Sequence, residues 1–194
     1  MKRLCAALML FAARGFLVPS ALAKEYVASL SAAQENPANG SIATGLADLS
    51  LVGDSLTVNV SWSGLTGPAT AAHIHCCIVP PTNTIVAIPF VGFPNAASGS
   101  YLHTFDLTNS SSYAGPFLAL YPNVAAAEAD VVAALNHNVN PGQTPIFKGA
   151  YVNIHTSANG GGEIRGFPTP EPGTLMLALL AAVGIGFAAH RRRP

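Results

Sequence analysis

The chain has 194 residues, of which half are hydrophobic and only 9% are charged, and nine basic residues balance nine acidic ones. Six of the basic residues lie near the two ends, so residues 24–168 hold three basic and eight acidic side chains, a net charge of −5. Three scattered cations exclude the basic surface that nucleic-acid binding requires. The length of this middle segment is that of one domain with a buried core.

Residues 1–23 have the three-part pattern of a secretory signal peptide. Lys2 and Arg3 precede an apolar stretch that Arg14 interrupts, and the "ALA" that ends at Ala23 provides the small residues of a cleavage site. We predict a signal peptide that is cleaved after Ala23; the alternative is a short N-terminal anchor or a buried helix. Export would place the rest of the chain in an oxidising environment.

The residues that follow alternate between apolar and polar, as in a β-strand with one buried face. The clearest runs, 47–51 and 56–62, flank a glycine-aspartate break and predict a hairpin. Further strands are predicted at 25–33, 70–77, 85–90, 99–108, 148–156 and 163–167. One alanine-rich stretch, 123–138, predicts a helix with Asn123 as its N-cap.

Many short strands, frequent turns and one helix in a connection indicate a mainly β fold. We expect an antiparallel β-sandwich or a partly closed barrel with one short helix. The domain organisation that follows is a signal peptide at 1–23, a β domain at 24–168 and a hydrophobic C-terminal segment at 169–194.

The stretch "TAAHIHCC", residues 70–77, places two histidines on one face of its strand. Alternate residues of a strand share a face, so His73 and His75 lie about 6.5–7 Å apart on the side away from the apolar residues. His155 has the same position on a later strand. Three imidazoles suit zinc or copper, so His73, His75 and His155 are candidate ligands of a metal site. The alternative is that the rings pack or hydrogen-bond against neighbouring strands.

Two adjacent cysteines follow the histidines, and they are the only ones left if Cys5 is removed with the signal peptide. Free thiols in an oxidising compartment require an explanation. Cys76 and Cys77 can form a vicinal disulfide, although adjacent Cα atoms lie only about 3.8 Å apart, below the usual disulfide range. Alternatively, Cys77 is a thiolate ligand beside the histidines, or both cysteines are small buried hydrophobes.

Glu163 and Arg165 are two residues apart and therefore share a face of the last strand. We expect a cross-strand ion pair, or a hydrogen bond from Arg165 to a loop carbonyl, rather than a catalytic carboxylate, because no second acid stands near in the sequence. The chain also has no nucleophile elbow, P-loop or dinucleotide fingerprint. These features predict a protein that is not an enzyme.

The C-terminus combines a short motif, an apolar stretch at about 174–189 and a basic end. The motif and the basic end consist of Pro170, Glu171, Pro172, Arg191, Arg192 and Arg193. The apolar stretch is slightly short for a hydrocarbon core of about 30 Å, but a helix of this length can span a thinned bilayer with the arginines in the cytoplasm. The three parts in this order resemble the PEP-CTERM sorting signal of Gram-negative bacteria.

This resemblance implies a partner and a destination. In that family the tail is recognised by a membrane protease called exosortase, so we expect the tail to be an address that is removed. The chain is then anchored in the inner membrane during transit and afterwards reaches the cell surface or the extracellular space. Exopolysaccharide and other matrix components are expected partners, and nucleic acid is not.

Three segments of the middle domain resemble the CHRD (chordin-like) domain. They are "GLTGPATAAHIHCC", "GSYLHTFDL" and "AYVNIHTSANGGGEIRGF", in that order, and the resemblance covers about residues 26–168. The usual bacterial form has glycine after "HIH", where this chain has Cys76 and Cys77. Growth-factor binding by chordin itself is not carried over. We therefore expect a non-enzymatic structural or binding role outside the cytosol, and the alternative is a copper- or zinc-binding module.

Overall fold

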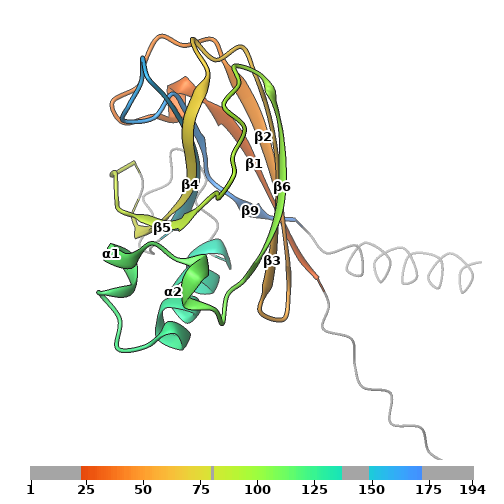
Figure 1. The fold of residues 1–194 in the computed structure, drawn as a ribbon, viewed down its shortest axis with the longest axis vertical. Coiled ribbons are helices and arrows are strands. Elements are labelled where there is room, and N and C mark those ends of the chain that lie inside the picture. The colour runs from red at the N-terminus through yellow and green to blue at the C-terminus, as the bar shows by residue number, and fades with distance from the viewer. Residues whose placement is uncertain (1–22, 80, 137–148, 172–194) are drawn as a thin grey trace, which may run out of the picture.

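The computed structural model describes residues 23–79, 81–136 and 149–171 (Figure 1). The strands are β1 Lys24–Ser31, β2 Thr44–Val52, β3 Ser55–Ser63, β4 Ala69–Ile78, β5 Val86–Pro89, β6 Gly99–Asp106, β7 Gly149–Thr156, β8 Ile164–Gly166 and β9 Thr169–Pro170. The helices are α1 Gly115–Leu118 and α2 Val124–Asn136, with short 3-10 turns at Ala32–Gln34 and Ser110–Ser112.

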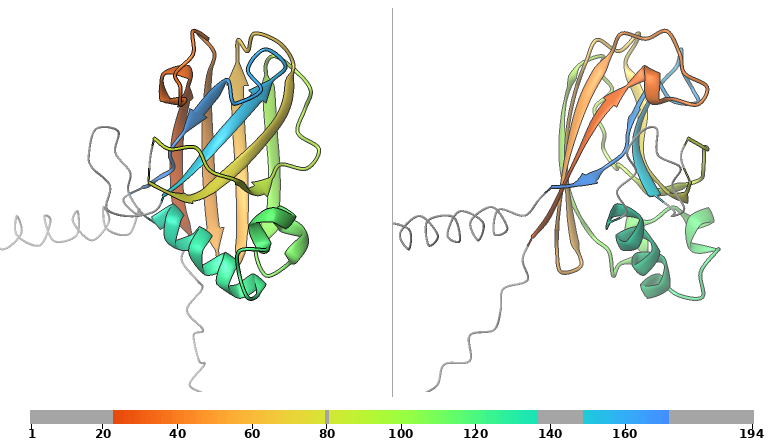
Figure 2. Two further views of the ribbon diagram at one scale, coloured as in Figure 1. Left: turned by 90° about the vertical axis from the view of Figure 1, so that its left-hand side faces the viewer. Right: turned by 180° about the vertical axis from the view of Figure 1, so that it is seen from behind.

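All nine strands belong to one antiparallel sheet in the order β5-β4-β7-β8-β1-β2-β3-β6, and β9 pairs with β1. The sheet curls so that β4 and β7 face β1, β2, β3 and β6 across the core, which gives an open half-barrel (Figures 1 and 2). The predicted mainly β fold, a sandwich or partly closed barrel with one short helix, is confirmed.

The hairpin of β2 and β3 forms where the alternating pattern predicts it. A two-residue turn joins Val52 to Ser55, and Gly53 in this turn has a φ of 57°, which glycine adopts without steric cost. The apolar residues of both strands, such as Leu49 and Val58, are fully buried. Because these two residues are cross-strand partners, their side chains pack together on the core face.

An aromatic cluster covers the seam between the edge strands β5 and β6. Phe90 follows β5 and stacks on Tyr101 of β6, with ring centroids 5.2 Å apart. Phe93 stacks on Trp62 of β3 at 4.4 Å, and Phe90 also lies 6.0 Å from Phe105. Side-chain packing therefore closes the half-barrel at the edge where backbone pairing stops.

The two helices lie together below β4 and β5, at one end of the half-barrel (Figures 1 and 2). α2 begins where predicted, because the Oδ1 atom of Asn123 accepts a hydrogen bond from the backbone N–H of Ala126 at 2.9 Å. Its buried residues are Ala127, Val131, Ala134 and Leu135. Within the ranges that the structure describes, no helix has the length and apolarity to cross a membrane.

Several predicted features lie outside these ranges. They are nearly all of the signal peptide at 1–23 and the hydrophobic helix at about 174–189, together with Pro172 and the three terminal arginines. Both segments therefore remain predictions from sequence. Of the sorting motif, Pro170 lies in β9 opposite Tyr26, and the backbone N–H of Glu171 donates to the Glu25 carbonyl at 2.8 Å.

We predict that Trp62→Ala lowers the free energy of unfolding by about 3–5 kcal/mol. Trp62 is 4% exposed, stacks on Phe93 and donates its indole N–H to the Ala96 carbonyl, so truncation leaves a cavity and an unpaired acceptor. Chemical denaturation measures the change. Leu102→Ala is the control, since Leu102 is 71% exposed and its loss is expected to change little. Equal losses in the two variants would contradict the core assignment.

Candidate metal centre

The three histidines lie on the face of the sheet that is turned away from the core. His73 and His75 are on β4, and His155 is on the neighbouring strand β7, where it lies opposite Ala71. Ile74, between the two histidines of β4, and Ile154, next to His155 on β7, point into the core and are fully buried. Period-two alternation thus brings the predicted ligands together, because two antiparallel strands present their polar sides to the same face.

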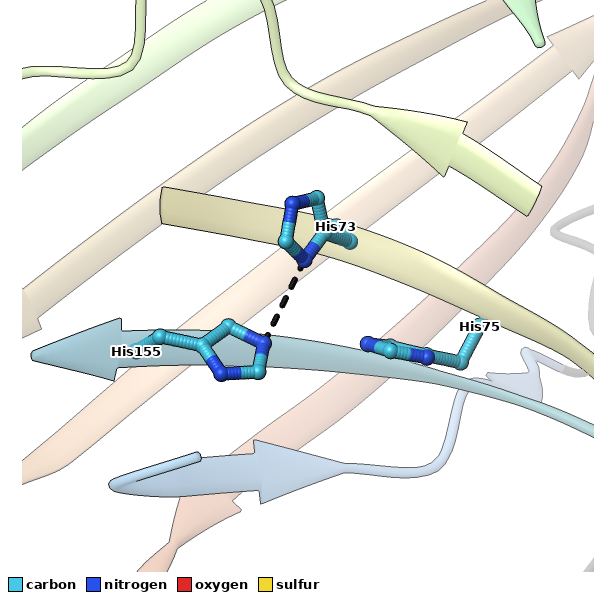
Figure 3. A group of neighbouring side chains, drawn as sticks. All are labelled: His73, His75 and His155. Carbon is cyan, nitrogen blue, oxygen red and sulfur yellow. Dashed lines mark hydrogen bonds between the residues drawn. The ribbon is translucent and has the colours of Figure 1, made fainter. Parts of the chain in front are cut away.

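The histidine rings converge over β4 and β7 (Figure 3). One nitrogen from each ring can be chosen so that all three lie within 4.8 Å of one another. The closest pair is Nδ1 of His73 and Nε2 of His155, at 3.3 Å. Two nitrogens bound to one tetrahedral zinc ion are separated by about 3.3 Å, given bonds of about 2.0–2.1 Å. One pair therefore already has the spacing of two zinc ligands, and the nitrogen of the third ring lies within 4.8 Å of both.

Two backbone carbonyls orient the rings. Nδ1 of His75 lies 2.8 Å from the Thr84 carbonyl, and Nδ1 of His155 lies 3.0 Å from the Gly160 carbonyl. A carbonyl oxygen only accepts hydrogen bonds, so in each neutral ring Nδ1 carries the proton and Nε2 keeps its lone pair. Nε2 of His75 is buried and has no hydrogen-bond partner among the described residues. Carbonyl partners of this kind orient metal-bound histidines.

Burial keeps the histidines neutral. Burial first, and then the neighbouring imidazoles, lower the pKa of His73 from 6.5 to about 4. Burial also lowers the pKa of His75 to about 4, although its bond to the Thr84 carbonyl opposes the shift. The pKa of His155 is lowered for the same reason. Neutral imidazole is the form that binds metals.

Arg165 holds the loops beside this site. Its side chain is fully buried and donates from Nε to the Gln34 carbonyl, from one terminal nitrogen to the Pro81 carbonyl at 2.9 Å, and from the other to Oδ1 of Asn83 at 2.9 Å. The guanidinium also lies over the Tyr151 ring, 4.9 Å from its centroid. The predicted hydrogen bond from Arg165 to a loop carbonyl is confirmed, and two carbonyls are involved.

Glu35 is the buried carboxyl next to Arg165, and sequence patterns do not indicate it. Its Oε2 lies 3.8 Å from Nε of Arg165. Burial raises the pKa of Glu35 to about 7, although the nearby guanidinium opposes the shift. Oε1 of Glu35 and Oδ1 of Asn153 are both buried without hydrogen-bond partners among the described residues. A cluster of polar groups therefore continues from the histidines to the Glu35 loop, because Asn153 is the cross-strand partner of His73.

Glu163 is a second buried charged residue that holds loops in place, at the end of β7 near Thr156. Its two carboxylate oxygens accept hydrogen bonds from Ser41, from both the backbone and the hydroxyl of Thr66, and from Thr156, at 2.6–2.8 Å. Burial alone would raise the pKa of Glu163, but these hydrogen bonds outweigh it and lower the pKa to about 2. With all these bonds made, the carboxylate has a structural role.

Cys76 and Cys77 are joined by a disulfide in the structure. Simple alternation would place Cys77 beside the histidines, but a bulge between Cys76 and Ile78 interrupts the pairing of β4 with β7. Both cysteines instead line a pocket of about 380 Å³ next to α1 and α2. The sulfur of Cys77 is not part of the group of converging ligand atoms.

The comparisons with known proteins agree with the two sequence resemblances. The family model described as CHRD domain matches residues 26–167, and the model described as PEP-CTERM protein-sorting motif matches residues 168–193. Neither the curated proteins nor the solved structures provide a match. The sorting motif marks this chain as an exported protein that an exosortase-type system processes.

We predict that Glu163→Gln destabilises the protein by about 1–3 kcal/mol at neutral pH, because the amide cannot accept from all the donors around it. The pKa of Glu163 is depressed from 4.5 to about 2 in the folded protein, so its ionised form stabilises the fold above pH 4.5. The difference from wild type should shrink as the pH falls from about 4.5 to about 2. Urea denaturation at several pH values tests this, with the exposed Glu25→Gln as the control.

Proposed function

The chain belongs to the CHRD family, and on this premise we propose that it is a non-enzymatic binding domain of the cell surface or extracellular matrix that holds a transition-metal ion. The ligands are His73, His75 and His155, and the metal is zinc or copper. The cell-surface location follows the exosortase-type sorting that the C-terminal motif provides. The domain's role is to bind, with the metal as part of its binding surface.

The observation that carries the proposal is the convergence of three neutral imidazoles, two of which are oriented by backbone carbonyls. Nδ1 of His75 and Nδ1 of His155 are occupied by carbonyls, so their Nε2 atoms carry the lone pairs, and Nε2 of His155 accepts a hydrogen bond from Nδ1 of His73 that a metal ion would replace. The two nitrogens of this hydrogen bond lie 3.3 Å apart. A buried lone pair without a partner, as at His75, costs free energy unless something binds it, and a cation relieves that cost.

The proposal of a non-enzymatic role rests on how the other ionisable groups are used. Glu163 and Arg165 are engaged in hydrogen bonds that hold loops, and the low pKa of Glu163 makes it a poor proton donor or acceptor near neutral pH. Glu35 has a pKa of about 7, but it is 7% exposed and faces Arg165. Glu35, Glu163 and Arg165 are thus built into the scaffold.

Metal binding is tested on the full-length protein in detergent, stripped with a chelator and titrated with zinc or copper(II) by calorimetry. We expect one ion per chain and, at a metal concentration about 100 times the Kd, an increase in Tm of about 5–10 °C. Each of His73→Ala, His75→Ala and His155→Ala should weaken binding by about 100-fold, because a direct ligand is worth at least as much as an outer-shell partner.

His103→Ala is the matched control for these variants. His103 lies on β6, is exposed, and is not part of the converging group. Its removal should leave affinity and stoichiometry unchanged. If zinc and copper bind none of the proteins, or if His103→Ala weakens binding as much as His73→Ala, the metal-binding function is wrong.

Sorting by the tail provides a separate test. Deleting Arg191–Arg193 should leave the protein in the cell envelope without surface delivery, because the basic end fixes the orientation of the apolar segment. Surface labelling and fractionation of cells measure the distribution. Replacing the three arginines by lysines keeps the charge and is the control, which should sort normally if charge alone orients the segment. Normal delivery of the deletion variant would contradict the role of the basic end.

A further inference from the structure

The disulfide lies at the edge of a pocket that solvent reaches. The pocket, of about 380 Å³, is lined by both cysteines, by Phe117 of α1, by Tyr121 shortly after α1, and by Asp130 of α2. The hydroxyl of Tyr121 donates to the Asp130 carboxylate at 2.9 Å, which fixes the side chains of the pocket wall. A disulfide exposed in a pocket is open to thiol exchange, whereas one enclosed in a core is not.

The two sulfurs have different surroundings. Cys76 is 1% exposed and packs in the core, whereas Cys77 is half-buried. Sγ of Cys76 lies 4.0 Å from the Asp130 backbone carbonyl. In the oxidised state this sulfur has no proton to donate, but the thiol of reduced Cys76 would find an acceptor already in place. The geometry thus provides one accessible sulfur and one buried leaving group.

We propose that Cys76–Cys77 is a redox-active disulfide that a small dithiol opens through this pocket, and that opening it weakens metal binding at the three histidines. A thiolate of the dithiol attacks Sγ of Cys77, the S–S bond breaks, and Cys76 leaves as a thiolate that takes up a proton. The second thiol of the reductant then displaces Cys77 and closes its own disulfide. Two electrons and two protons pass from the dithiol to the protein.

Thr84 connects the disulfide to the histidines. Its hydroxyl donates to the Cys76 carbonyl at 3.4 Å, and its own carbonyl accepts from Nδ1 of His75 at 2.8 Å. Its backbone N–H donates to the hydroxyl of Tyr151, whose ring stacks on His75 with centroids 4.7 Å apart. The disulfide closes a small ring with the peptide between its cysteines. Opening that ring frees the Cys76 backbone, whose carbonyl accepts from the Thr84 hydroxyl. Thr84 then loses this anchor, and its own carbonyl no longer holds the His75 ring in place.

The expected effect is a loss of about 10–100-fold in metal affinity on reduction, the usual result of losing an outer-shell partner. This half of the inference rests on the proposed metal-binding function.

The test uses full-length protein in detergent, either oxidised or reduced with dithiothreitol and freed of reductant under inert gas. Cobalt(II) is the probe, because its visible spectrum reports both affinity and the presence of thiolate ligands.

The outcomes separate the alternatives. Weaker cobalt binding by the reduced protein, without a thiolate-to-cobalt band, supports the inference. Equal affinity in both states overturns the coupling while the metal function stands. Tighter binding with a thiolate band also overturns it, because Cys77 would then be a ligand. The double variant Cys76→Ser and Cys77→Ser should bind cobalt like the reduced protein and should not respond to the dithiol.

Access through the pocket has a test that needs no metal. Leu120 lines the pocket and is 68% exposed, so Leu120→Trp should obstruct the entrance without disturbing the core. We expect the rate of disulfide reduction by dithiothreitol to fall by about tenfold or more, as measured by thiol release, while cobalt binding by the oxidised variant stays unchanged. If neither state binds cobalt, zinc or copper, the metal function is wrong, and this rate still decides whether the dithiol opens the disulfide through the pocket. An unchanged rate would overturn the pocket as the route.

Discussion

The buried guanidinium of Arg165 is the constraint on which the polar side of this domain depends. A fully buried cation is costly unless its donors are satisfied, and here two loop carbonyls and Asn83 accept from it. Those acceptors belong to the segment around Gln34 and to the loop between β4 and β5. Both segments are therefore fixed against the outer face of β7 and β8, although neither has extensive strand pairing there.

This anchoring determines the chemistry of the histidines. The loop that Arg165 holds at Pro81 and Asn83 continues to Thr84, whose carbonyl fixes the tautomer of His75. Glu163 also holds loops in place, at the other end of the site. Its carboxylate joins the loops that contain Ser41 and Thr66 to Thr156, which ends β7 next to His155. Strands place the imidazoles on one face, but loop carbonyls decide which nitrogen His75 and His155 present.

Alternation was sufficient to predict the fold class and the common face of the histidines. A strand's period of two depends only on backbone geometry, so the positions of His73 and His155 relative to the core could be read from the neighbouring apolar residues. The N-cap of α2 at Asn123 was predictable for a similar reason, since the side chain satisfies a local backbone donor. Which strands become neighbours was not predictable, because β4 pairs with β7 across about half the domain.

The cysteines show where local reasoning fails. One extra residue in β4 shifts the register after Cys76, so the alternation that holds for His73 and His75 cannot be continued to Cys77. A bulge depends on the partner strand and leaves no signal in composition. Because of this bulge, β4 presents its imidazoles on the outer face of the sheet and its disulfide at the end of the half-barrel where the helices lie. Residues 73–77 of β4 thus hold two of the three candidate metal ligands and both cysteines of the candidate redox site, and Thr84 contacts both sites.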